Sequence, residues 1–254
     1  MIRSLYFHNP NPEGFESIVR YLYSNGYRFI SIDELYNRLN NCDTKGKLVY
    51  ISLDDGWKGN LMLFPIIERY NIPITLFITV NPIVSGNFWW EFVAKKVGYA
   101  QMQDFKKLSY DEFECQLKQI KKEIGNLQRS AMTIDELKMI ANHSLVSIQS
   151  HTLNHPILTK LPDELLDFEL SESQKQLQII TGKSVFAFSY PNGTLTNREI
   201  NVAKKYYEMA FSTEQNNISE KSDIYSLPRY ALTGDYKSDL FKMYGIWKYL
   251  KKLL

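Results

Sequence analysis

The chain has 254 residues, which is enough for one large domain or two small ones. Its 30 Lys and Arg nearly balance its 28 Asp and Glu, so the net charge of +2 gives no field that would favour nucleic-acid binding. No apolar run reaches the roughly 18 residues that a transmembrane helix needs, so no transmembrane helix is predicted. Two cysteines, Cys42 and Cys115, exclude a disulfide scaffold and a cysteine-based metal cluster. The N-terminal sequence lacks the long apolar run of a signal peptide, so we expect a cytoplasmic protein.

Short β-type runs alternate with helical runs along the chain. Two helix starts are marked by capping-box spacing, Ser31 with Glu34 and Thr133 with Glu136. Residues 87–130 break the alternation with a long charged helical stretch, which we interpret as an excursion from the core. Strands are predicted at 2–7, 48–53, 74–80, 145–150, 184–189, 210–213 and 227–232.

This alternation predicts an α/β fold with a parallel sheet built from right-handed crossovers. The number of predicted strands favours a distorted barrel over two open sheets. We find no repeat, low-complexity stretch or linker, so residues 1–254 are expected to form one domain. In such barrels the functional residues lie at the C-terminal ends of the strands, on the loops that follow.

Two adjacent carboxylates follow the strand that ends at Leu53. Asp54 and Asp55 would repel each other, and in an extended chain their side chains point to opposite sides, so we do not expect them to share one role. One could ligate a cation while the other stays free as a base, and Gly56 permits a sharp exit from the strand. The same three residues are also typical of a solvated turn.

Two of the four histidines follow predicted strand 145–150. His151 and His155 are four residues apart, which would place them on one side of a helical turn, close enough to share a metal ion. Pro156 disfavours the α conformation at His155, so this turn should end there. His8 also follows a predicted strand, and the fourth histidine is interpreted as a structural or surface residue.

Two neutral imidazoles and one carboxylate would leave open positions on a divalent ion, as in catalytic rather than structural sites. The mixed nitrogen and oxygen ligands suit Zn²⁺, and also Co²⁺, Ni²⁺ or Mn²⁺. Such an ion would lower the pKa of a bound water and polarise a substrate carbonyl, while the free aspartate takes the proton. Hydrolysis of an amide or ester is therefore the predicted reaction class.

Three segments, ISLDDGW, SHTLNHP and FSYPNG, occur in this order, each after a predicted strand. Together they resemble the motifs of the polysaccharide deacetylase family of carbohydrate esterases, and the resemblance extends over about residues 1–232. It implies a distorted seven-stranded (β/α) barrel and metal-dependent removal of acetyl groups from N-acetylated sugars. Carried over residue by residue, Asp54 matches the general base, and Asp55, His151 and His155 match the metal ligands.

The third motif departs from the family pattern. The family commonly has Arg-Pro-Pro-Tyr there, with the Arg holding the base, whereas this chain has Ser189, Tyr190, Pro191 and Asn192. The resemblance assigns an oxyanion contact to the backbone N–H of Asn192, and we expect Tyr190 and Pro191 to contact substrate. Arg229, near the last predicted strand, is the best replacement for the missing Arg, since a charge-assisted pair would keep the base ionised. The alternative is a surface Arg on an edge strand.

A second departure concerns the general acid. The family's C-terminal Leu-x-His motif is absent after residue 232, but some members are circularly permuted and carry this strand at the front. LYFHNP fits that arrangement, and His8 would then protonate the leaving amine. Alternatively, His8 only packs at the mouth of the barrel.

Three tryptophans are candidate substrate contacts. Trp89 and Trp90 either stack on a sugar face or anchor the excursion against the barrel. Trp57, close to Asp55, is expected to line the acetyl pocket or the substrate groove.

The C-terminal segment 237–254 is predicted to form an amphipathic helix. Its apolar face would hold Leu240, Phe241, Tyr244, Trp247 and Leu250. We interpret it as a closing helix packed on the barrel, with peripheral membrane contact as the alternative.

The sequence therefore predicts a metal-dependent deacetylase that acts on N-acetylhexosamine units of a glycan or glycan precursor. An O-acetyl sugar esterase could use the same site, because esters are easier to hydrolyse than amides. A glycan-binding relative without turnover is the remaining alternative.

Overall fold

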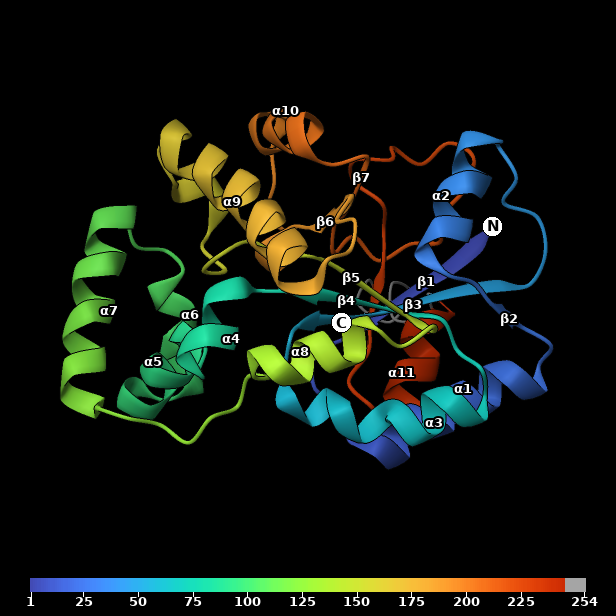
Figure 1. The fold of residues 1–254 in the computed structure, drawn as a ribbon, viewed down its shortest axis with the longest axis horizontal. Helices are drawn as coiled ribbons and strands as arrows, with labels where there is room; N and C mark the ends of the chain where they lie inside the picture. Colours follow the sequence, from blue (N-terminus) through green and yellow to red (C-terminus); the bar gives the residue numbers. More distant parts are fainter. Residues whose placement is uncertain (245–254) are drawn as a thin grey trace, which may run out of the picture.

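A curled parallel sheet forms the centre of the molecule (Figure 1). Its strands are β1 (Ile2–Phe7), β2 (Arg28–Phe29), β3 (Leu48–Asp55), β4 (Ile74–Ile78), β5 (Val146–Ser150), β6 (Ala187–Ser189), β7 (Met209–Phe211) and β8 (Tyr230–Ala231). The computed structural model describes residues 1–244, and within them the strand order is β7-β6-β5-β4-β3-β1-β8, with β2 paired to β3. Each ladder between these neighbours is parallel.

The segment that ends in β8 curls the sheet back on itself. Leu227 forms a parallel bridge to Phe211 of β7, and its carbonyl accepts the backbone N–H of Ser212 at 2.9 Å. A few residues later, Tyr230 of β8 pairs with Leu5 of β1. The predicted α/β fold with a distorted barrel of parallel strands is confirmed, and β2 is a short additional strand that the sequence did not predict.

Helices cover both sides of the sheet. They are α1 (Pro12–Ser24), α2 (Ile32–Asn40), α3 (Phe64–Arg69), α8 (Ile134–Ala141), α9 (Asp163–Thr181) and α10 (Asn197–Tyr206), with short 3-10 turns at Lys58–Leu63, Leu158–Lys160 and Pro191–Gly193. In Figure 1, α3 and α8 lie below the strands and α9 and α10 lie above them. Because the ladders are parallel, the carboxyl ends of β3, β5 and β6 meet at one end of the barrel.

Only one of the two predicted capping boxes forms completely. Thr133 and Glu136 bond reciprocally at the start of α8, as expected. At α2 the Ser31 hydroxyl accepts the backbone N–H of Glu34 at 3.1 Å, but the Glu34 carboxylate binds two arginine side chains instead of a backbone N–H. Charge-assisted bonds to guanidinium groups are stronger than one bond to a neutral amide, which explains the exchange.

The excursion, residues 87–130, lies beside the barrel and is entirely helical or irregular. The chain reaches it through α4 (Val80–Ser85), and it contains α5 (Trp89–Val97), α6 (Tyr99–Phe105) and α7 (Tyr110–Ile124), drawn in green in Figure 1. These helices have their own apolar cluster, formed by Trp89, Val93, Met102, Phe105, Phe113, Leu117 and Ile120. None of the helices in residues 1–244 is long and apolar enough to cross a membrane.

The C-terminal helix buries only part of the predicted face. Helix α11 (Tyr236–Met243) packs Leu240 against the core as predicted, but it also buries Asp239 and Met243, while Phe241 and Tyr244 are exposed. The Asp239 carboxylate accepts the backbone N–H groups of Thr233 and the following glycine, which ties α11 to the end of β8 and fixes its rotation. The remainder of the predicted helix, residues 245–254, lies outside the described residues.

Candidate active site

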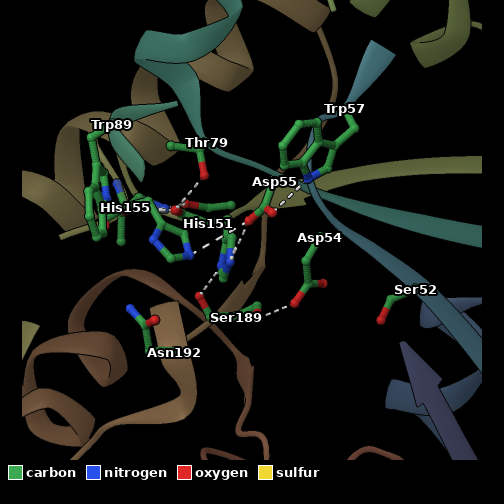
Figure 2. A network of polar contacts seen from close by, with 12 residues as sticks. Ser52, Asp54, Asp55, Trp57, Thr79, Trp89, His151, His155, Ser189 and Asn192 are labelled. Atoms are coloured by element: carbon green, nitrogen blue, oxygen red, sulfur yellow. Dashed lines mark hydrogen bonds and ion pairs between the residues drawn. The ribbon is translucent and has the colours of Figure 1, made fainter. Parts of the chain in front are cut away.

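Three potential metal ligands meet at the C-terminal end of the barrel (Figure 2). Asp55 ends β3, and His151 and His155 follow β5. Asp55 Oδ1 lies 3.4 Å from His151 Nε2 and 3.6 Å from His155 Nε2. All three side chains are buried. The structure therefore brings together the three residues that the sequence nominated as a metal site.

The donor atoms suit a divalent cation. Four ligands about 2.05 Å from a tetrahedral zinc ion are roughly 3.3 Å apart, close to the separations of the Asp55 carboxylate from the two imidazoles. Asp55 Oδ1 is buried and has no hydrogen-bond partner in residues 1–244, which is costly unless a cation binds it. Three protein ligands leave a further position for water or substrate, and the nitrogen and oxygen set does not select one metal.

The loop that carries the two histidines is irregular, so the predicted helical turn is wrong. Thr152 has φ 71° and His155 has φ 56°, both in the left-handed region that non-glycine residues seldom adopt. The Thr152 hydroxyl accepts the His155 N–H at 2.9 Å, and the Glu169 carboxylate of α9 accepts the backbone N–H groups of Leu153 and Asn154. These bonds offset the backbone strain and turn both imidazoles toward Asp55.

Neighbouring groups orient each ligand. His151 Nδ1 donates to the Ser189 carbonyl at 2.7 Å, which leaves the lone pair of Nε2 facing Asp55. Trp57 Nε1 donates to Asp55 Oδ2 at 2.8 Å, so Oδ1 remains available for a cation. Burial by itself would raise the pKa of Asp55, but the neighbouring imidazoles, His151 foremost, lower it overall. The ligand carboxylate is therefore ionised at neutral pH.

Asp54 makes a separate set of contacts, as its predicted role as the free base requires. Arg229 donates two hydrogen bonds of 2.9 Å to its two carboxylate oxygens, and the guanidinium is fully buried. Arg229 also donates to the hydroxyls of Ser52 and Ser189. Burial by itself raises the pKa of Asp54, but the charge and hydrogen bonds of Arg229, together with the nearby histidines, lower it overall. The predicted alternative of a surface Arg229 is wrong.

A local distortion lets the two adjacent aspartates reach the same space. In a regular strand Asp54 and Asp55 would point to opposite faces. Asp55 has φ 79°, which turns the chain at the end of β3, and both side chains line one cavity of about 400 Å³. The following Gly56 also has a positive φ, of 96°, in agreement with the sharp exit expected there.

The cavity contains most of the predicted substrate contacts. Trp57, Trp90 and Asn192 line it, and so does His8, whose exposed ring lies edge-on to Tyr6 with 5.4 Å between centroids. The cavity is also lined by Tyr6, Asp54, Asp55, Trp89, Met102, Lys106, His151, His155, Tyr190 and Thr213. The placement of His8 agrees with an acid at the rim, and its catalytic role stays a prediction.

The structure changes the expected substrate contacts of Trp89, Tyr190 and Pro191. Trp89 donates its N–H to the His155 carbonyl at 3.0 Å and packs on Phe113, so it anchors the excursion as well as lining the cavity. Tyr190 lines the cavity but is fully buried, and its hydroxyl donates to a backbone carbonyl, so this hydroxyl is not free to bind substrate. Pro191 is buried and does not line the cavity, because it starts a 3-10 turn behind the wall.

Sequence reasoning missed two polar residues of the site. Ser189 connects the potential metal ligands to the proposed base, since its carbonyl accepts a hydrogen bond from His151 and its hydroxyl contacts Asp54 at 3.3 Å. It lies in the third motif, where nothing in the sequence gives a reason to assign it a role. Lys106 reaches the cavity from the excursion and had no sequence signal. His143 lies elsewhere, 3.1 Å from Glu68, as expected of a structural histidine.

Comparison with known proteins agrees with this geometry. A family model described as polysaccharide deacetylase matches residues 41–209. The poly-beta-1,6-N-acetyl-D-glucosamine N-deacetylase of Staphylococcus aureus (strain MSSA476) is 25% identical over 236 residues, which are 90% of this chain and 69% of that protein. The solved structure of the Streptococcus pyogenes deacetylase PplD in complex with acetate has a TM-score of 0.69 at 19% identity, covering 95% of this chain and 96% of that one.

A polysaccharide deacetylase from Bacillus cereus, BC0361, is similar in fold, with a TM-score of 0.66 at 19% identity over 95% of this chain and 68% of that one. These structural likenesses agree with the curled parallel sheet described above. The family match spans β3 to β7 and includes the aspartate pair and both loop histidines. The chain belongs to the polysaccharide deacetylase family.

Proposed function

We propose that this protein is a metal-dependent hydrolase that removes N-acetyl groups from N-acetylhexosamine units of a glycan or glycan precursor. The observation that carries the proposal is the position of Asp54, ionised by Arg229, beside the cluster of Asp55, His151 and His155. Zn²⁺ is the expected ion, with Co²⁺, Ni²⁺ or Mn²⁺ as alternatives. The activity named for the Staphylococcus aureus relative supports an N-acetylated sugar polymer as the substrate class.

Each residue has a distinct part in the proposed reaction. Asp55 and the two histidines would hold a divalent cation, which would supply Lewis-acid chemistry by polarising the acetamide carbonyl and making the attacking water more acidic. Asp54 accepts the proton of that water, because its carboxylate is ionised and fixed by Arg229. The backbone N–H of Asn192 donates to the oxygen that gains negative charge.

Departure of the amine completes the reaction. The leaving nitrogen needs a proton, and His8 at the cavity rim is the proposed donor. Cleavage of the C–N bond then gives acetate and a free amino sugar. The three cavity tryptophans provide apolar walls of the kind that stack on sugar rings.

The substitution Asp54→Asn tests the proposal. It removes the proton acceptor but keeps the side-chain volume and the metal ligands, so acetate release should fall by at least about 100-fold. Bound metal should stay at one ion per chain, measured by elemental analysis of protein whose folding is checked by circular dichroism. Asp104→Asn, at an exposed residue paired only with Lys107, is the matched control and should release acetate at the normal rate.

Near-normal acetate release by Asp54→Asn would contradict its role as the base. The substrates are N-acetylated and O-acetylated forms of the same sugars, so the assay also separates amide hydrolysis from ester hydrolysis. Binding of sugar without acetate release from either form, under any of the four metals, would instead favour a glycan-binding protein.

A further inference from the structure

Lys106 connects the excursion to the barrel across the cavity. It follows α6, and its half-buried side chain lines the cavity. Its ammonium donates to Asn192 Oδ1 at 2.6 Å, and Asn192 lies in the loop after β6. The two residues are 86 positions apart in the chain, so only the docking of the excursion brings them together.

This bond determines which way the Asn192 amide faces. A lysine ammonium can only donate, so the amide oxygen faces Lys106 and the amide nitrogen faces elsewhere. That nitrogen is buried and finds no acceptor among residues 1–244. Figure 2 shows Asn192 beside the two imidazoles, with which it shares the cavity wall. A buried donor without a partner is destabilising, so this one is suited to meet an acceptor on a ligand.

Lys106 itself has no anionic partner. In the part of the chain that the structure describes, its hydrogen bond goes to a neutral amide and it forms no ion pair. Burial lowers the pKa of Lys106, and the charge of Asp55 only partly opposes this. A half-buried cation of this kind is unfavourable on its own, which marks it as a candidate functional group.

The other charges of the cavity are already engaged. Asp54 is neutralised by Arg229 through two hydrogen bonds, and Asp55 faces the two imidazoles that would share a cation with it. No cavity carboxylate is therefore free to balance Lys106, and a bound divalent ion would add further positive charge. An anionic ligand that enters the cavity would supply both the missing acceptor and the missing negative charge.

We infer that Lys106 and Asn192 form a subsite for an anionic oxygen group, a carboxylate or a phosphate, on the acetylated sugar. This inference rests on the proposed function and adds a preference for charged over neutral acetylated sugars. Lys106 supplies the positive charge, and the Asn192 amide nitrogen supplies a directed donor. Because Lys106 belongs to the excursion, this part of the chain sets the charge preference of the site.

The test compares N-acetylated sugars with and without an anionic group. N-acetylglucosamine is the neutral probe, N-acetylmuramic acid carries a carboxylate, and N-acetylglucosamine 1-phosphate and 6-phosphate carry a phosphate. Binding is followed on the metal-loaded protein by tryptophan fluorescence immediately after mixing, since Trp57, Trp89 and Trp90 line the cavity. Acetate release is measured separately, as KM and kcat.

At least one charged sugar should bind the wild-type protein more tightly than the neutral one. Lys106→Met should weaken binding of that charged sugar about tenfold more than binding of the neutral sugar, because a charge-assisted bond is lost. Lys106→Arg should restore most of the preference. The control Lys107→Met, at a neighbouring exposed lysine that pairs with Asp104, should keep the wild-type preference.

Equal affinity of the wild-type protein for neutral and charged sugars would overturn the subsite. So would an equal loss for both kinds of sugar in Lys106→Met, which would indicate a structural role for the lysine. Binding and turnover are read independently, so the two proposals can fail separately. Charged sugars that bind through Lys106 without releasing acetate would contradict only the proposed function, and acetate release without charge preference would contradict only the subsite.

Discussion

The buried ion pair of Asp54 and Arg229 should dominate the stability of the site. In Arg229→Met the side chain keeps much of its apolar volume but loses the guanidinium, which leaves the Asp54 carboxylate buried without its cation. Two charges about 4 Å apart at an effective dielectric constant of roughly 20 attract by about 4 kcal/mol. Breaking a buried pair from one side typically costs about 3–5 kcal/mol, so the two magnitudes agree.

The free energy of unfolding, from urea denaturation at neutral pH, measures this effect. We expect Arg229→Met to lose about 3–5 kcal/mol. The control Arg69→Met removes a surface arginine that pairs with Glu16 and is 62% exposed, and it should lose less than about 1 kcal/mol. If Arg229→Met also lowered the free energy of unfolding by less than about 1 kcal/mol, the reasoning would be refuted, because an unpaired buried carboxylate would then be tolerated.

A double variant separates charge from packing. Asp54→Asn combined with Arg229→Met leaves no buried charge at this position, so it should be more stable than Arg229→Met alone. Arg229 also lies over the ring of Tyr6, at 4.2 Å from its centroid. If the double variant is as unstable as the single one, lost packing of this kind explains the effect, and the electrostatic account is wrong.

Four further predictions concern the histidine loop and its metal. His155→Ala removes a proposed metal ligand, and zinc affinity is measured by competition with a chromogenic chelator. The affinity should fall by more than the roughly 10–100-fold that is typical when a residue that only supports a ligand is replaced. An unchanged affinity would exclude His155 as a ligand. Glu169→Gln keeps one oxygen for the backbone N–H groups of Leu153 and Asn154 but removes the charge and turns a donor toward the Asn154 side-chain amide, so we expect zinc affinity to fall about tenfold, whereas His143→Ala, remote from the site, should leave it unchanged. Trp89→Phe removes the donor to the His155 carbonyl and should lower the free energy of unfolding by about 1–2 kcal/mol, and an unaltered value would mean that water replaces the indole N–H. Chelation of the wild-type protein should lower its melting temperature, and zinc should restore it, because binding to the folded state alone is stabilising.

The sequence by itself was sufficient to predict the fold class and the principal site residues. Alternating strands and helices imply a parallel sheet, and parallel strands place their carboxyl ends, with the residues that follow, at one rim. Asp54 and Asp55 at the end of β3 and the two histidines after β5 had to approach one another for that reason. Arg229 could be nominated because a buried carboxylate base needs a cation and the third motif lacked one.

Only the tertiary structure decided how these residues act together. Both histidines face Asp55 through a loop that contains two left-handed residues. Glu169 of α9 binds the backbone between those two residues, a contact between the loop after β5 and α9 that no local pattern contains. Lys106 reaches the cavity because the excursion docks on the barrel. The physical reason is that strand periodicity and capping are local, whereas side-chain direction depends on partners far away in the chain. Tyr190 illustrates this, since it turned toward the core and a distant backbone carbonyl.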